Sequence, residues 1–235
     1  MRKAMRFTAL VVALGLLLSG CERRNEPVPS VKHEQTAFAG TIICVGDSLT
    51  AGYGVKETDA YPAQLENKLR SEGYRWRVIN AGISGETSSG TYSRITWLLK
   101  LKPAIVILET GANDGLRGID PKVTRKNIEE IVRILKGNKV TVVLAGMRMV
   151  TNLGRDYIAE FAAVYPAVAR KFDIVLIPFF LQGVAVDPSL NQSDGIHPLA
   201  KGYRIVTETV YPYVLQAVKK KENKVKEPNV QTGKY

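Results

Sequence analysis

His197 is one of only two histidines in the chain, and its surroundings suit a catalytic base. The other, His33, precedes the folded region predicted below. Asp194 comes three residues before His197 in the stretch SDGIHP, with Gly195 between them to allow a tight turn. A carboxylate so placed can fix the imidazole tautomer and stabilise the cation that forms when the ring takes a proton. Either residue could instead cap a helix that begins near Pro198, and the two roles are compatible.

Ser48 is the candidate nucleophile. It lies in the stretch ICVGDSLTAGYG, separated by two residues from the end of an apolar run. A serine hydroxyl becomes reactive when an imidazole can accept its proton. The stretch does not match the Gly-x-Ser-x-Gly turn of α/β-hydrolases, because Gly46 is present but position 50 is Thr. Serines near glycines also stabilise turns, so Ser48 taken alone leaves a structural role open.

Acyl transfer also needs hydrogen-bond donors for a negatively charged oxygen, each worth about 10²–10³ in rate. The backbone N–H groups of Ser48 and Gly85 are candidates, and Gly85 lies in the stretch NAGISGETSSG. The side chain of Asn113, in ETGANDGLRG, could add a third donor. Its alternative role is to stabilise a turn.

Short β-branched apolar runs alternate with longer amphipathic ones from residue 40 onward. The short runs predict parallel strands covered on both faces, at 41–45, 76–80, 104–109, 139–145 and 173–178. The longer runs predict helices at about 60–72, 87–100, 121–136, 156–171 and 198–218. This alternation indicates an α/β fold: a three-layer α/β/α sandwich with a flavodoxin-like parallel sheet of about five strands. Ligands bind beyond the carboxyl ends of such strands, where the candidate loops lie.

Three prolines refine the helix predictions. Pro121 and Pro198 suit the first turn of a helix, where a missing N–H has little effect. Pro166 falls inside the fourth predicted helix and is expected to bend or split it.

Four short blocks resemble the GDSL, or SGNH, hydrolases. They are GDSL at 46–49, the glycine of SGET at Gly85, GAND at 111–114 and DGIH at 194–197, in the order that the family has them. The resemblance covers about residues 40–215 and implies the SGNH hydrolase fold. It implies Ser48 as nucleophile, His197 as base and then acid, and Asp194 as the group that orients it. It also implies an oxyanion hole formed by Ser48, Gly85 and Asn113.

The longer matches resemble one branch of this family, the bacterial secreted acyl-CoA thioesterases, lysophospholipases and arylesterases. The resemblance implies hydrolysis of small-molecule acyl esters or thioesters through an acyl-enzyme, with no cofactor. It also places a mobile substrate-side loop at 147–157. Apolar Ile83, Leu116 and Ile119 could line an acyl groove or belong to the core. With two histidines and one cysteine besides Cys21, a usual zinc site is not expected.

Three other functions stay open. Carbohydrate O-deacetylation by the same scaffold would need a polar cleft. A non-catalytic lipoprotein that binds lipid or glycan would need no ester turnover, although Ser48, Asp194 and His197 argue against it. A nucleotide-binding flavodoxin-type module would retain a cofactor on purification.

The first 20 residues read as a signal peptide, with basic residues followed by an apolar run. The motif LSGC, ending at Cys21, resembles the lipobox of bacterial lipoproteins, in which the cysteine is acylated. Residues 21–38 then read as a polar tether, and 39–218 as the hydrolase domain. These features predict a protein of the bacterial cell envelope that is lipid-anchored through Cys21 on a periplasmic or extracellular face. The remaining Cys44 reads as a buried apolar residue, with a catalytic thiol as the alternative.

The formal net charge of +11 is concentrated outside the predicted domain. Residues 39–218 hold 21 basic and 17 acidic residues, with no basic stripe of the kind that binds nucleic acid. Residues 219–235 hold six lysines and two glutamates and predict a disordered tail. Attraction of that tail to anionic lipid is a second possibility. A monomer is expected.

Overall fold

A parallel sheet forms the frame of the molecule in the computed structural model, which describes residues 37–149 and 153–226. Its strands are β1 (Gly40–Gly46), β2 (Trp76–Gly82), β3 (Ile105–Glu109), β4 (Thr141–Ala145) and β5 (Val175–Ile177). They lie in the order β2-β1-β3-β4-β5, and each neighbouring pair is parallel. The predicted α/β sandwich with a flavodoxin-like sheet is therefore confirmed. The strand order reverses between β1 and β3, which is where such sheets bind ligands.

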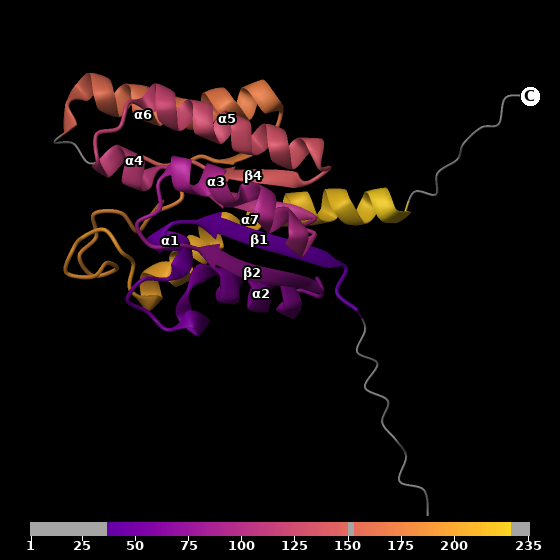
Figure 1. Cartoon of the computed structure of the whole chain (residues 1–235). Coiled ribbons are helices and arrows are strands. Elements are labelled where there is room, and N and C mark those ends of the chain that lie inside the picture. Colours follow the sequence, from indigo (N-terminus) through magenta and orange to yellow (C-terminus); the bar gives the residue numbers. More distant parts are fainter. Residues whose placement is uncertain (1–36, 150–152, 227–235) are drawn as a thin grey trace, which may run out of the picture. The chain divides into compact units, whose positions relative to one another are not determined.

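Helices cover both faces of this sheet (Figure 1). On one face, α2 (Tyr61–Ser71) packs against α7 (Ala200–Lys226). On the other, α5 (Pro121–Gly137) packs between α3 (Ser88–Leu98) and α6 (Arg155–Phe172). The shorter α1 (Ser48–Ala51) and α4 (Ala112–Leu116) follow β1 and β3 directly, and the 3-10 turns η1 (Glu57–Asp59) and η2 (Leu99–Leu101) complete the connections.

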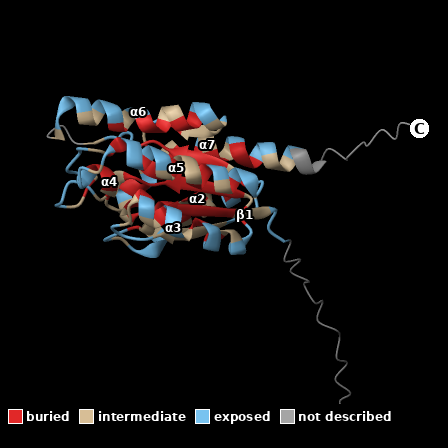
Figure 2. Cartoon of the chain, turned by 45° about the horizontal axis from the view of Figure 1, so that its top comes forward, coloured by how far each residue is buried: buried red, intermediate tan, exposed pale blue. Residues whose placement is uncertain are grey.

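The core lies between the sheet and these helices. The central strands β1, β3 and β4 are mostly buried, the edge strands β2 and β5 are partly exposed, and the helices expose their outer faces (Figure 2). Central strands buried on both faces need continuous apolar runs, as β1 and β3 have. Each fully buried aliphatic side chain contributes about 1.5–3 kcal/mol. Cys44 belongs to this core, and burial raises the pKa of its thiol to about 12. The reading of Cys44 as an apolar residue is thus confirmed, because so high a pKa leaves no thiolate for catalysis.

The proline predictions had mixed outcomes. Pro121 is the first residue of α5, where Asp120 caps the helix by accepting from the Lys122 N–H at 2.8 Å. Pro198 was wrongly placed, because α7 begins two residues later, at Ala200. Pro166 does not split α6, which runs as one helix from Arg155 to Phe172.

The chain ends differ in how far the structure describes them. The predicted signal peptide, Cys21 and all but the last two residues of the tether lie outside the described residues. At the other end, α7 continues to Lys226, so its predicted end at residue 218 and the fully disordered 219–235 tail were wrong for residues 219–226. Residues 227–235 lie outside the described part. Among the described helices, none is both long and apolar enough to span a bilayer.

Candidate active site

Ser48 is the first residue of α1, immediately beyond the carboxyl end of β1. Asp47 caps this short helix, because its carboxylate accepts from the Leu49 N–H at 2.9 Å. Gly46 is required for the turn to close: a Cβ there would lie 2.2 Å from Thr50 Oγ1. The serine hydroxyl is thereby held on a tight turn between strand and helix.

A chain of two hydrogen bonds joins Ser48, His197 and Asp194. Ser48 Oγ lies 2.8 Å from His197 Nε2, although 149 residues separate them in the sequence. His197 Nδ1 lies 2.7 Å from Asp194 Oδ2, and the other carboxylate oxygen accepts from the backbone N–H of His197 at 3.0 Å. Neither residue caps a helix, since α7 starts at Ala200. The structure therefore brings the three predicted residues into contact.

The ionisation of Asp194 determines where the protons lie in this row of hydrogen bonds. The backbone N–H and then the ring of His197 hold the pKa of Asp194 at about 2, so the carboxylate is ionised at neutral pH. An ionised carboxylate only accepts hydrogen bonds, which places the proton of a neutral imidazole on Nδ1. Nε2 is then the acceptor for the Ser48 hydroxyl, as general base catalysis requires.

Tyr53 is a neighbour of His197 that sequence reasoning missed. Its ring centroid lies 4.7 Å from that of His197 at a tilt of 46°. Gln192 secures the segment by donating from its side-chain amide to the Tyr53 carbonyl oxygen at 2.7 Å. The tyrosine thus limits the movement of the imidazole.

The three predicted oxyanion-hole residues border one pocket of about 220 Å³ beside Ser48 and His197. Gly85 adopts a φ of +78°, in the left-handed region that favours glycine. Within the described residues, the backbone N–H groups of Ser48 and Gly85 donate to no protein acceptor. Asn113 donates from Nδ2 to Asp47 Oδ2 at 3.1 Å and has a second amide hydrogen to offer. These donors surround the space that a substrate oxygen would occupy.

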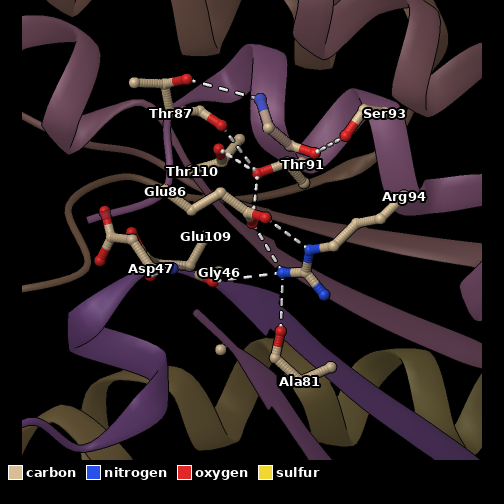
Figure 3. Close-up of polar contacts among 12 residues, drawn as sticks. Gly46, Asp47, Ala81, Glu86, Thr87, Thr91, Ser93, Arg94, Glu109 and Thr110 are labelled. Carbon is tan, nitrogen blue, oxygen red and sulfur yellow. Dashed lines mark hydrogen bonds and ion pairs between the residues drawn. The ribbon is translucent and has the colours of Figure 1, made fainter. Parts of the chain in front are cut away.

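A largely buried ion pair fixes two of the loops to one another (Figure 3). The Arg94 guanidinium, on α3, binds both carboxylate oxygens of Glu86 at 2.6 and 2.7 Å. It also donates to the carbonyl oxygens of Ala81, at 2.8 Å, and Gly46, at 3.4 Å. Because Glu86 adjoins Gly85 and Gly46 precedes the Asp47–Ser48 turn, one side chain sets the separation of two predicted donors.

Two threonines extend this network to the loop that follows β3. Thr91 Oγ1 donates to Glu86 Oε2 at 3.0 Å and lies 2.9 Å from Thr110 Oγ1, just beyond β3. Farther along the same loop, the buried Asp114 carboxylate accepts from the Ser88 N–H at 2.7 Å. The loop that holds Asn113 is therefore tied to α3 at two points.

A buried pair of carboxyl groups lies beneath Ser48. Glu109 Oε2, at the end of β3, accepts from the Asp47 N–H at 3.1 Å and from Thr50 Oγ1 at 2.9 Å. Burial raises the pKa of both carboxyls, and the charge of Asp47 raises that of Glu109 further. Hydrogen bonds from Leu49 and Asn113 oppose this rise at Asp47, and those from Thr50 and the Asp47 N–H oppose it at Glu109. Sequence reasoning missed this pair, for which the one signal was an acidic residue closing an apolar strand.

A second pocket, of about 480 Å³, adjoins the first and shares Leu49, Ala112, Leu116 and Ile196 with it. Its other lining residues are mainly apolar and include Met147, Met149, Phe179, Leu181 and Val186. Of the residues predicted for an acyl groove, Leu116 lines both pockets, whereas Ile83 and Ile119 line neither. Met147 and Met149 come from the predicted 147–157 loop, of which residues 150–152 lie outside the described part.

Comparison with known proteins identifies the family. Residues 44–205 match the model of the GDSL-like lipase/acylhydrolase family. The chain belongs to this family. The acylhydrolase is 40% identical over 198 residues to "Esterase TesA" of Pseudomonas aeruginosa, covering 84% of this chain and 96% of the relative. It is 41% identical over 165 residues to "Thioesterase 1/protease 1/lysophospholipase L1" of Escherichia coli, covering 70% and 78%.

A solved structure titled "Crystal Structure of TesA" superposes on the acylhydrolase with a TM-score of 0.73 at 39% identity. The match covers 75% of this chain and 99% of that one. The expected resemblance to GDSL hydrolases, and to the branch with thioesterases, lysophospholipases and arylesterases, is therefore confirmed.

Proposed function

We propose that this acylhydrolase is a serine esterase that cleaves carboxylic ester and thioester bonds through an acyl-enzyme intermediate. The observation that carries the proposal is the continuous hydrogen-bonded chain from Ser48 Oγ through His197 to Asp194, beside a pocket bordered by backbone and amide donors. Its family and the printed names of its relatives support the same reaction.

In the first half-reaction, Ser48 Oγ attacks the acyl carbonyl carbon while His197 Nε2 takes the hydroxyl proton. The carbonyl oxygen gains negative charge and accepts hydrogen bonds from the N–H groups of Ser48 and Gly85 and the amide of Asn113. Asp194 stabilises the imidazolium. When the intermediate collapses, the proton passes from Nε2 to the departing alcohol or thiol, and Ser48 is left acylated.

The second half-reaction releases the acid. Water attacks the acyl carbon while His197 takes its proton, and the same donors stabilise the second tetrahedral oxygen. Collapse breaks the bond to Ser48 Oγ, which recovers the proton from Nε2. Each proton transfer thus begins or ends on one ring nitrogen, and Asp194 holds that ring in place.

The second pocket supports an apolar acyl group as the preferred substrate. It adjoins the pocket that Ser48 borders, and its lining is mainly apolar, with Leu, Ile, Met and Phe side chains. Arylesters, lysophospholipids and acyl-CoA share such a group, whereas a carbohydrate acetyl ester would place a polar sugar against these surfaces. We therefore infer that acyl esters are hydrolysed in preference to acetylated sugars.

The test is a substrate panel with matched serine variants. Ser48→Ala should lower kcat by at least ~10⁴-fold on p-nitrophenyl esters, acyl-CoA and lysophospholipid. Ser84→Ala, in the same pocket but without a bond to His197, should retain turnover. Equal activity of Ser48→Ala and wild type would contradict the mechanism. Faster turnover of acetylated sugars than of C8–C16 acyl esters would instead favour the deacetylase.

We also propose that the protein acts as a monomer in the cell envelope, anchored through acylated Cys21. The LSGC motif after an apolar segment supports the anchor, and the origin of every site residue in one chain supports the monomer. Labelled palmitate should enter wild type and Cys44→Ser but not Cys21→Ser. Label retained by Cys21→Ser would refute the anchor, and sedimentation of the detergent-solubilised protein as a dimer would refute the monomer.

A further inference from the structure

The amino edge of the sheet, opposite the active site, has a surface of its own. We define the amino edge as the segments that precede β1 to β5, at 37–39, 72–75, 99–104, 136–140 and 171–174, together with the end of α7 at 216–223. Two contacts join that helix to the edge: Trp76 Nε1 donates to Glu222 Oε1 at 2.9 Å, and Lys221 Nζ donates to the Lys139 carbonyl oxygen at 3.0 Å.

Cations dominate this edge. Its basic residues are Arg75, Lys100, Lys102, Lys136, Lys139, Lys171, Lys219, Lys220 and Lys221, and Lys171 also pairs with Glu129. All but Lys221 are exposed. Only three acidic residues accompany them among the described residues of the edge: Glu72, Asp173 and Glu222. Lys219 to Lys221 are consecutive in the sequence, whereas the other cations come from separate segments that only the fold brings together.

The carboxyl edge, which holds the active site, has no such excess. Its surface cations are Lys56, Arg117, Lys122, Arg148, Arg155 and Lys201. Acidic side chains match them in number there: Glu57, Asp59, Asp120, Asp156, Asp187 and Asp194. The charge of the domain is therefore polarised along the strands.

A hollow within the amino edge is large enough for a phosphate group. It measures about 240 Å³, lies between β4, β5 and α7, and is lined by Lys136 and Lys220 as well as Asp173. Two cations against one carboxylate favour an anionic occupant.

The chain that comes from the proposed lipid anchor joins the domain at this same edge. The described chain begins at Ala37, and the Ala39 N–H donates to the Arg75 carbonyl oxygen at 2.8 Å, beside the start of β2. Cys21 lies 16 residues before Ala37, a span of at most about 55 Å when extended. In Figure 1 the start of β1 and the end of α7 lie on one side, and the loops that follow the strands lie on the other.

We propose that the amino edge docks on anionic phospholipid headgroups of the membrane that holds Cys21, so that the active site faces away from that membrane. This inference rests on the anchor proposed above. Clustered lysines next to an anchor add electrostatic attraction to such a surface. The seven residues of β1 separate the two edges by roughly 20 Å. Ser48 would then meet substrates that arrive from the aqueous side, not the phospholipids beneath the protein.

Orientation on vesicles tests this. The full processed protein is reconstituted into vesicles of phosphatidylcholine alone or mixed with phosphatidylglycerol. A dye is placed on Asn138→Cys, at the amino edge, or on Lys122→Cys, at the carboxyl edge, and energy transfer to a headgroup acceptor is measured. Cys44 stays unlabelled because it is buried and its thiol pKa is about 12. With phosphatidylglycerol at low salt, the dye at 138 should lie closer to the headgroups than the dye at 122.

Charge variants provide the control. The triple variant Lys100→Gln, Lys219→Gln and Lys220→Gln should abolish the difference between the dyes, as should high salt. The matched variant removes equal charge from the carboxyl edge through Lys56→Gln, Lys122→Gln and Lys201→Gln. Because Lys122 is substituted in it, the carboxyl-edge dye is moved to Arg155→Cys, and the other dye stays on Asn138→Cys. This variant should preserve the difference between the two dyes. Equal distances for the two dyes in wild type, or the same response from both triple variants, would overturn the proposal.

The anchor and the docking surface can fail separately. If Cys21 is not acylated, the protein should not bind phosphatidylcholine vesicles yet should still bind those with phosphatidylglycerol, about 100-fold more tightly than the amino-edge variant. Salt-sensitive binding to double-stranded DNA without binding to these vesicles would assign the edge to another polyanion and overturn docking on lipid. Ester turnover by Ser48 in solution is unaffected by either outcome.

Discussion

The two edges of one sheet differ in almost every physical respect. At the carboxyl edge, long loops bury polar groups beneath Ser48, and the Asp47–Glu109 pair and the Arg94–Glu86 ion pair fix their geometry. At the amino edge, short connections and the end of α7 carry mainly exposed cations. In a parallel sheet the carboxyl ends of all strands lie at one edge and their amino ends at the other. The catalytic loops can therefore gather at one edge while the excess of positive charge lies at the other.

Helix geometry contributes to this polarity. The helices that lead into β4 and β5 end at the amino edge, and cations such as Lys136 and Lys171 near those ends interact favourably with the helix dipoles. The same cations can therefore stabilise the fold and attract an anionic surface. Measurements of stability and of vesicle binding separate the two effects.

Removing an amide from each edge should give the largest contrast. Asn113→Ala is expected to lower kcat by about 10²–10³-fold, because one oxyanion donor is lost. Asn138→Ala, at the amino edge, removes only an exposed bond to the Ile134 carbonyl oxygen and should leave kcat unchanged. Steady-state kinetics on a p-nitrophenyl ester measures both. A similar loss in the two variants would erase the distinction between the edges.

Breaking the ion pair behind the active site should mainly affect stability. Arg94→Ala leaves Glu86, whose side chain is 7% exposed, without its partner and should lower the free energy of unfolding by about 3 kcal/mol. Arg70→Ala breaks an exposed pair with Glu66 and should cost less than about 1 kcal/mol. Urea denaturation compares them. Equal losses of unfolding free energy in the two variants would show that the Arg94–Glu86 pair does not stabilise the loops of the site.

The buried carboxyl pair should make stability depend on pH. Because burial raises the pKa of Glu109 in the folded state, its stabilising contribution is present below the ordinary value of 4.5 and is lost as pH rises towards the raised pKa. Glu109→Gln cannot ionise and should flatten that decline, whereas Glu160→Gln, on the surface, should not. Thermal unfolding across neutral and alkaline pH measures the slopes. Parallel slopes for wild type and Glu109→Gln would contradict this assignment.

Neutralising the amino edge should have the smallest effect on chemistry. The triple variant Lys100→Gln, Lys219→Gln and Lys220→Gln should keep kcat on a soluble ester within about twofold of wild type, as surface substitutions usually do. A larger loss without vesicles present would mean that the two edges are coupled. Activity assays in solution, run beside the vesicle experiments, settle this.

The sequence and the structure agree best where short-range patterns carry the information. The β-branched runs correctly predicted β1 to β5 to within a few residues, because a doubly covered strand needs uninterrupted apolar side chains. Prediction failed for α1 and α4, whose few residues have no amphipathic period and form only against the loops of the site. Of the two outcomes expected at Pro166, the split did not occur, and α7 ends later than predicted because the helix continues past the local signals.

The sequence by itself determined which groups are available: a serine after the first strand, a single imidazole in the folded region, a carboxylate three residues before it, and the α/β alternation that brings loops to one edge. Tertiary structure alone decided the 2.8 Å approach of Ser48 to His197, the buried partners Glu109 and Arg94, the apolar pocket and the basic amino edge. These depend on contacts between segments far apart in the chain, which periodicity and residue spacing do not encode.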